Sequence, residues 1–214
     1  MIIKDGLWFV KKNRSLPKIE SVIPKLNSEV TKEEVIAISK DYQFEMKNYD
    51  FTAAGSDLVF EDYKIDEKIN HIDGITVEEA EHMMATKLYQ NNAKVHFNHF
   101  VEKGGRFGKR IVYGGHVISL TRSISFNGLS NAFKIIAING GTHASPCFAG
   151  KTVFAWSKII EKVDVSDTLG ALRIRTNGLG DAQPYQFQHQ DQNGKFNSDV
   201  LLSLDYWALV PKKT

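Results

Sequence analysis

The feature of the sequence that most restricts its fold is a nearly uncharged segment that begins at a glycine pair, Gly114 and Gly115, and ends near Gly128. The residues at helical spacing within this segment are mostly apolar: Val117, Ile118, Leu120, Thr121 and Ile124. Because almost no charge interrupts the pattern, we expect a helix that is apolar on most sides and therefore buried. Gly128 is expected just past the end of this helix, where glycine is common.

Four β-rich runs follow this segment, at residues 133–139, 152–161, 169–176 and 199–210. In the third run, Leu172 and Ile174 alternate with arginines, which is typical of an antiparallel strand. A glycine- and glutamine-containing stretch is expected to form a long loop between the last two runs. Together these patterns predict an α+β fold in which an antiparallel sheet wraps around a long central helix.

The N-terminal quarter of the chain differs from the rest, because it is rich in lysine and has one clear helical period. A capping-box pattern that starts at Thr31 predicts a helix over residues 32–46. Residues 51–56 are typical of a linker. We therefore predict an N-terminal extension, residues 1–55, that is partly helical, and a main domain over residues 56–214.

The stretch between the extension and the buried helix gives weaker signals. Residues 59–72 are mixed in character and are expected to be extended. A second capping-box pattern, which begins at Thr76, predicts a helix over residues 76–89. The glycine-rich, polar stretch 91–109 is expected to be mostly loop.

Composition excludes several classes of protein. The 27 Lys and Arg residues nearly balance the 25 Asp and Glu residues, so nothing indicates a nucleic-acid surface. Cys147 is the only cysteine, which excludes an intrachain disulfide and a cysteine-based zinc site. The longest stretch without charged residues, 135–150, is too short and too polar to span a bilayer, and no secretory signal is recognisable. We expect a cytoplasmic protein that binds neither nucleic acid nor membrane.

Three other short motifs do not indicate a functional site. Residues 150–152 match the end of a phosphate-binding loop, but a strand-like run follows them where a helix is needed. His96 and His99 would suit two metal ligands only on a helix, and their segment is expected to be irregular, so no metal site is predicted. Cys147 is more typical of a small core residue than of a nucleophile.

The segment before the buried helix holds the candidate site. His96 follows Asn91 by five residues, and a histidine with a polar neighbour at a loop mouth can act in acid–base catalysis. Free backbone N–H groups at a helix that starts with glycine, as at Gly114, can stabilise an oxyanion. A lone histidine is more often structural, however, and a glycine pair more often marks tight packing. From the residues alone, both interpretations stay open.

The order of the motifs resembles that of the MaoC-like acyl dehydratases, which are hot-dog-fold enzymes of the (R)-specific enoyl-CoA hydratase type. The matching motifs are TVEEAE at 76–81, Asn91 with HFN at 96–98, FGKRIVYGG at 107–115, PCFAGKTV at 146–153 and LDYWALVP at 204–211. The resemblance extends over residues 59–213. The Asn…His-Phe-Asn form looks most like the branch with mesaconyl-CoA hydratases and methylmalyl-CoA dehydratases.

The resemblance implies a sheet wrapped on a long helix, a homodimer or higher homo-oligomer of such units, and a CoA thioester bound between subunits with no further cofactor. His96 matches the catalytic histidine of the family. Gly114 matches the glycine whose N–H polarises the thioester carbonyl. Asn91 stands where the best-known members carry an aspartate, and a neutral amide can orient water but cannot take its proton.

Five neighbouring residues are expected to contact the substrate under this resemblance. Gly115 and Tyr113 flank the oxyanion position, and Tyr113 replaces a histidine that often precedes the glycine. The basic cluster Arg106, Lys109 and Arg110 could hold the CoA phosphates, although short basic runs are usually only solvated.

The resemblance therefore predicts a hydro-lyase that adds or removes water across an α,β-unsaturated acyl-CoA, such as mesaconyl-CoA or a related branched dicarboxylic acyl-CoA. Two alternatives stay open. A hot-dog thioesterase would use the same oxyanion helix but release free thiol. A non-catalytic acyl-CoA-binding protein would fit the asparagine at position 91.

Overall fold

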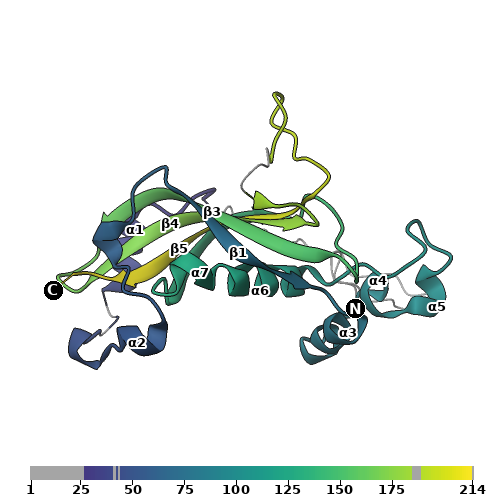
Figure 1. Ribbon diagram of the computed structural model, residues 1–214, viewed down its shortest axis with the longest axis horizontal. Helices are drawn as coiled ribbons and strands as arrows, with labels where there is room; N and C mark the ends of the chain where they lie inside the picture. The colour runs from purple at the N-terminus through teal and green to yellow at the C-terminus, as the bar shows by residue number, and fades with distance from the viewer. Residues whose placement is uncertain (1–26, 41, 43, 185–188, 214) are drawn as a thin grey trace, which may run out of the picture.

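A computed structural model describes residues 27–40, 42, 44–184 and 189–213 of the chain. Within these residues, five antiparallel strands form one sheet in the order β1-β3-β4-β5-β2 (Figure 1). The strands are β1 Lys68–Thr76, β2 Lys134–Thr142, β3 Thr152–Asp164, β4 Leu169–Gly180 and β5 Val200–Pro211. The predicted α+β class and antiparallel sheet are confirmed, with β1 and β2 at its edges.

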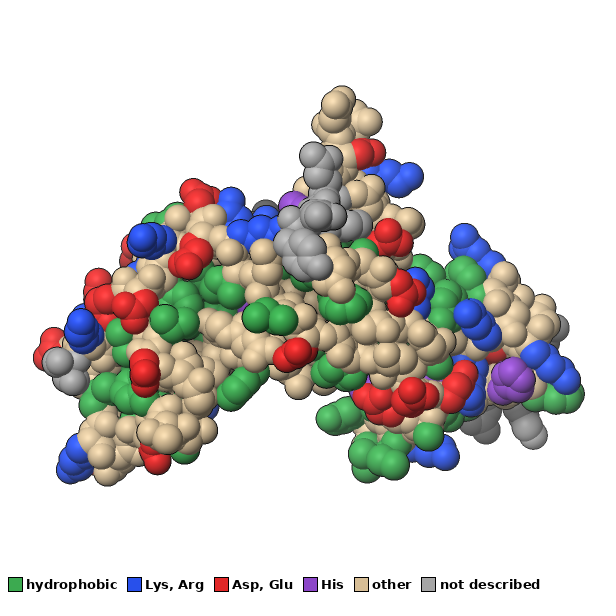
Figure 2. Space-filling view, in the orientation of Figure 1, with side chains coloured by type: hydrophobic (Ala, Val, Ile, Leu, Met, Phe, Trp, Pro, Cys, Tyr) green, Lys and Arg blue, Asp and Glu red, His purple; other side chains and the backbone are tan. Residues whose placement is uncertain are grey.

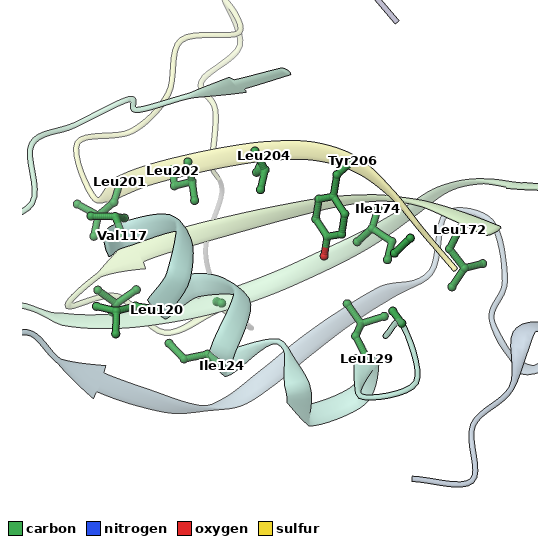
Figure 3. Close-up of a cluster of buried hydrophobic side chains, with 14 of the residues drawn as sticks. Val117, Leu120, Ile124, Leu129, Leu172, Ile174, Leu201, Leu202, Leu204 and Tyr206 are labelled. Carbon is green, nitrogen blue, oxygen red and sulfur yellow. The ribbon is translucent and has the colours of Figure 1, made fainter. Parts of the chain in front are cut away.

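The central helix α6, Gly114–Ile124, begins at the predicted glycine and lies along one face of the sheet (Figure 1). Its buried side chains Val117, Leu120 and Ile124 belong to a core that includes Leu202 and Tyr206 of β5 (Figure 3). The helix ends before the predicted glycine. Residue 128 has a φ of +101° and lies inside the next short helix, α7 Phe126–Leu129, where the backbone kinks. A Cβ there would meet a methyl group of Ile69, so the position needs glycine.

Strand β1 is the part of the sheet that the sequence patterns missed. The segment expected to be merely extended forms a short 3₁₀ helix, η2 Phe60–Asp62, and then β1, which pairs with β3. As an exposed edge strand, β1 buries fully only His71 and shows no alternating apolar pattern. Because Thr76 is the last residue of β1, it does not cap a helix; its hydroxyl lies 2.9 Å from that of Thr152. The following helix, α3 Glu79–Leu88, therefore starts later than predicted.

The stretch 91–109 is less irregular than expected, because it contains two short helices, and an asparagine side chain binds the backbone just before or at the start of each. Asn91 Oδ1 accepts a hydrogen bond from the Ala93 N–H (2.9 Å) just before α4, Lys94–Phe97. Asn98 Oδ1 accepts one from the Val101 N–H (3.2 Å) at the start of α5, His99–Glu102. His96 therefore lies on a helical turn and not in an irregular loop. The expected loop after β4 also begins later, because β4 continues to Gly180.

The N-terminal helix covers the other face of the sheet. Helix α1, Lys32–Ser39, begins at the predicted capping box but ends seven residues earlier than expected. Its Val35 is buried with Trp207 and Leu209. Along β5 these two residues alternate with those that face α6, so α1 lies on the opposite side of the sheet.

The segment that follows α1 forms two further short helices, η1 Met46–Asn48 and α2 Phe51–Ala54, and the second of them replaces most of the predicted linker. Residues 1–26 of the predicted extension lie outside the described residues, and the boundary at residue 55 stays a prediction. None of the helices formed by the described residues has the length and apolar character that crossing a bilayer requires.

Candidate active site

The ring of His96 is held in place by the strand-like segment that precedes α6. The Ile111 N–H donates a hydrogen bond to Val95 O (3.1 Å), and His96 Nδ1 lies 2.9 Å from Ile111 O. Because a carbonyl oxygen can only accept, Nδ1 must carry the proton. The neutral ring then has an unprotonated Nε2, which is the form that can accept a proton.

Gly114 brings the start of α6 to the same place. The first N–H groups of a helix have no partner within the helix. In α6 the His116 and Val117 N–H groups donate to Tyr113 O, at 2.9 and 3.3 Å, whereas the Gly114 N–H has no acceptor among the described residues. Gly114 and His96 line one cavity of about 340 Å³. The two residues that carry the sequence hypothesis are therefore brought together, with a helix N-terminus and an imidazole facing the same space.

The wall of this cavity comes from three segments of the chain. Its lining residues are His96, Ile111, Val112, Gly114, Val117, His143, Ala144, Ser145, Pro146 and Cys147. The last five belong to the loop between β2 and β3. None of these five is among the site residues predicted from the sequence. The available signal was the PCFAGKTV motif, which begins three residues after His143.

His143 lies directly over the start of α6. A Cβ on residue 114 would come within 2.7 Å of His143 Nε2, so the ring packs against the glycine and only glycine leaves room for it. Partial burial lowers the pKa of His143 below its ordinary value, because the charged form loses solvent. Nearby, burial raises the pKa of the Cys147 thiol to about 11, which keeps it neutral and fits the expected core role.

Tyr113 packs against His96, and Gly115 leaves space for the Tyr113 ring. The rings of Tyr113 and His96 meet edge to face, with centroids 5.8 Å apart. A Cβ on residue 115 would lie 2.6 Å from the Tyr113 ring, so the second glycine makes room for this tyrosine. Neither residue lines the cavity itself, and their contact with a substrate stays a prediction.

Asn91 does not line the cavity. Its side-chain oxygen accepts a hydrogen bond from the Ala93 N–H in the turn before α4, and its backbone N–H donates to Thr86 O (3.0 Å). This geometry fits the turn role that the sequence left open, and the predicted role as a water orienter stays untested.

The three residues of the predicted phosphate-binding cluster have different surroundings. Arg110 forms an ion pair with Glu79 and is already partnered. Lys109 lies 4.4 Å from the ring centroid of Phe148, and Arg106 stacks on its neighbour Phe107 at 5.0 Å; both cations are exposed. Figure 2 shows Lys and Arg side chains gathered over the end of the molecule that carries α4 and α5. Arg106 and Lys109 are therefore the members available to an anion.

Two other histidines near α3 are paired with carboxylates. His116 Nε2 lies 3.0 Å from Glu81 Oε1, and His82 Nε2 lies 3.1 Å from Glu79 Oε2. Both rings are buried and neither lines the cavity. Over the described part of the chain, no group of three or more His, Cys, Asp and Glu side chains is arranged to hold a metal ion.

The sequence is similar to two curated enzymes that are longer than this chain, although no family model matches it. It is 47% identical over 205 residues to the beta-methylmalyl-CoA dehydratase of Chloroflexus aurantiacus, which covers 95% of this chain and 57% of that protein. It is 46% identical over 204 residues to the mesaconyl-CoA hydratase of Cereibacter sphaeroides, with 94% and 57% covered. The chain thus spans a little more than half the length of these relatives.

Solved structures agree with this similarity. A crystal structure described as a MaoC domain protein dehydratase from Chloroflexus aurantiacus matches with a TM-score of 0.84 and 47% identity, over 95% of this chain and 58% of that one. A Mycobacterium tuberculosis protein described as a double hot-dog fold matches in fold alone, with a TM-score of 0.53 and 18% identity, over 79% of this chain and 48% of that one. The chain therefore belongs to the MaoC-like dehydratase family and has its hot-dog fold.

Proposed function

We propose that the chain is a hydro-lyase unit that adds water to, or removes it from, an α,β-unsaturated acyl-CoA. The observation that carries the proposal is the shared cavity of His96 and Gly114. There the hydrogen bond from Nδ1 to Ile111 O leaves Nε2 as a base, and the first N–H of α6, which has no acceptor in the described part of the chain, can donate to a ligand. The two relatives named for mesaconyl-CoA and beta-methylmalyl-CoA support the same reaction class.

In the hydration direction, His96 Nε2 takes a proton from water while the water oxygen forms a bond to the β-carbon. The electron pair of the C=C bond moves toward the α-carbon and the thioester carbonyl oxygen. The Gly114 N–H donates a hydrogen bond to the oxygen as its charge grows, and one such donor contributes roughly 3 kcal/mol. Protonated His96 then returns its proton to the α-carbon. Because the Asn91 amide cannot accept a proton, His96 carries out both transfers.

The proposed substrate is a branched dicarboxylic acyl-CoA, such as mesaconyl-CoA, because both relatives are named for substrates of this kind. The exposed cations Arg106 and Lys109 are the proposed contacts for the CoA phosphates. CoA enters only as part of the substrate, and no further cofactor is needed. With such a substrate, the proposed location is the cytoplasm.

The proposed assembly is a homodimer in which two copies pair along the edge of the sheet. The free edge of the sheet at β2 supports this proposal. Its Ile138 is 59% exposed, and Ile135 together with Phe126 of α7 lines a broad hollow of about 930 Å³. Sedimentation of the wild type and of Ile138→Lys tests the assembly, since a charge at an apolar interface should shift the protein to monomer.

The activity is tested with purified protein and mesaconyl-CoA. Loss of the absorbance of the conjugated thioester, without release of thiol to a thiol reagent, is the expected result. Thiol release at the same rate would indicate a thioesterase. Calorimetric binding of the CoA ester with no change of either signal would indicate a non-catalytic binding protein.

A further inference from the structure

The His143 ring is a polar group in the cavity that the proposed mechanism does not use. It lies over Gly114, and among the described residues no protein group forms a hydrogen bond with it. This differs from His96, whose Nδ1 is held by Ile111 O. The unpaired nitrogen atoms of His143 are therefore available to a ligand in the cavity.

The surroundings of His143 favour a neutral ring. No carboxylate is among the residues that line the cavity, so nothing there stabilises an imidazolium. The N-terminus of α6, against which the ring packs, carries a partial positive charge that also opposes protonation. The lowered pKa agrees with both. A neutral imidazole keeps one N–H donor and cannot serve as a strong acid at neutral pH.

We propose, on the basis of the proposed hydro-lyase function, that His143 is a catalytic residue that completes the oxyanion site by donating its ring N–H to the thioester oxygen held by the Gly114 N–H. The Nε2 end of the ring is the part closest to residue 114, so an oxygen bound at the start of α6 lies beside it. Two donors then share the negative charge that develops on the oxygen during water addition. The second donor comes from the β2–β3 loop, whose role the sequence did not indicate.

The test compares two substitutions that differ in one property. His143→Gln keeps an N–H donor at the Nε2 position and cannot titrate, whereas His143→Leu fills similar space without a donor. With mesaconyl-CoA, we expect kcat to fall about 10²-fold or more in H143L and less than about tenfold in H143Q, with KM little changed in both. His99→Leu is the matched control, because this histidine is exposed on α5 and does not line the cavity. Its kcat should equal that of the wild type.

Three results would overturn the role. H143L could retain the wild-type kcat, H143Q could be as slow as H143L, or H143Q could lose one limb of the pH–rate profile. The last result would make His143 an acid or base and not a fixed donor.

A binding measurement keeps this inference separate from the hydratase proposal. Butyryl-CoA has the thioester oxygen, whereas S-butyl-CoA has a methylene group in its place, and neither can be hydrated. Calorimetry with the wild type should show tighter binding of the thioester than of the thioether. In H143L, the ratio of the two dissociation constants should be about fivefold smaller than in the wild type. If the wild type binds both equally, or H143L keeps the full preference, the proposal for His143 fails. A wild type that shows the preference but hydrates no enoyl-CoA would instead contradict the hydratase function alone.

Discussion

At its N-terminal end, α6 shares a cavity of about 340 Å³ with two imidazoles, His96 and His143, whereas its C-terminal end borders a hollow of about 930 Å³. The larger space is the less reactive one, because two of its charged side chains, Asp73 and Arg122, already have hydrogen-bond partners. Asp73 Oδ2 accepts a hydrogen bond from the Asn127 amide (2.7 Å), and Arg122 donates to Ala132 O (2.6 Å). The larger cavity is therefore not the one that holds the proposed reactive residues.

Beneath the C-terminal end of α6, buried polar side chains form a chain of hydrogen bonds. His71 lies 2.6 Å from Asn127 O through Nδ1 and 2.8 Å from Ser157 Oγ through Nε2. The chain continues to Thr176 (2.8 Å) and to the Tyr206 hydroxyl (3.1 Å). The side chains of this chain satisfy one another and stabilise the fold, whereas His96 and His143 at the N-terminal end face a cavity. This division predicts that substitutions at one end alter rate and those at the other alter stability.

The largest expected effect is that of His96→Gln on rate. Glutamine keeps a polar side chain but cannot shuttle a proton, so we expect kcat with mesaconyl-CoA to fall about 10²- to 10⁴-fold. The free energy of unfolding in urea should change little, since the ring is only half-buried. A large loss of stability with an unchanged rate would place His96 among the structural residues and remove the proposed base.

The next effect concerns His71 and the pH dependence of stability. Burial lowers its pKa to about 4, below the ordinary value of 6.5. The unfolded chain therefore binds the proton more readily, and stability falls as pH drops from 6.5 to about 4, by about 3 kcal/mol in total. Urea unfolding across this range should show a flatter slope for His71→Gln than for the wild type, and an unaltered slope for His99→Gln. Equal slopes in all three proteins would contradict the prediction.

The sequence patterns predicted the elements whose side chains alternate between two environments. Helix α6 and strands β3, β4 and β5 have one periodic apolar face or a continuous buried run, and periodicity detects these. Strand β2 is an edge strand without a buried residue, but the apolar run at 135–138 in its sequence still indicated a strand. Strand β1 could not be detected in this way, because it is an edge strand that buries one polar side chain, His71. Its position depends on pairing with β3, which lies far along the chain.

Only part of the site was predicted, because some of its residues lie in recognisable motifs and others are brought there by the tertiary structure. His96 and Gly114 fall within recognisable motifs, and the structure places both on one cavity. The contact of His143 with Gly114 depends on where β2 ends and how the next loop returns over α6, so no spacing along the chain encodes it. The hydrogen bond from the Ala93 N–H to Asn91 depends on the local turn before α4, and a general expectation of a loop does not specify that turn.

A smaller effect on rate is expected from Gly114→Ala. Alanine retains the backbone N–H, but its Cβ would lie 2.7 Å from His143 Nε2 and must displace the ring. We expect kcat to fall at least about tenfold in the wild-type background and to change little further in His143→Ala, where the space is free. The coupling between the two residues is obtained from the kcat values of the wild type, Gly114→Ala, His143→Ala and the double variant. An equal loss in both backgrounds would mean that the methyl group obstructs the substrate itself, and the link between the two residues would be lost.

The smallest effect is that of Tyr206→Phe, which removes one hydroxyl from the buried chain at the C-terminal end. The loss of its hydrogen bond with Thr176 should lower the free energy of unfolding by about 1 kcal/mol, measured in urea, because Thr176 keeps Ser157 as a partner. Tyr89→Phe, on the exposed end of α3, should leave stability unchanged. Since Tyr206 does not line the cavity of His96, kcat should equal that of the wild type. A fall in kcat at unchanged stability would mean that the hydrogen-bonded chain acts on the reactive end, and the two ends of α6 could no longer be treated as independent.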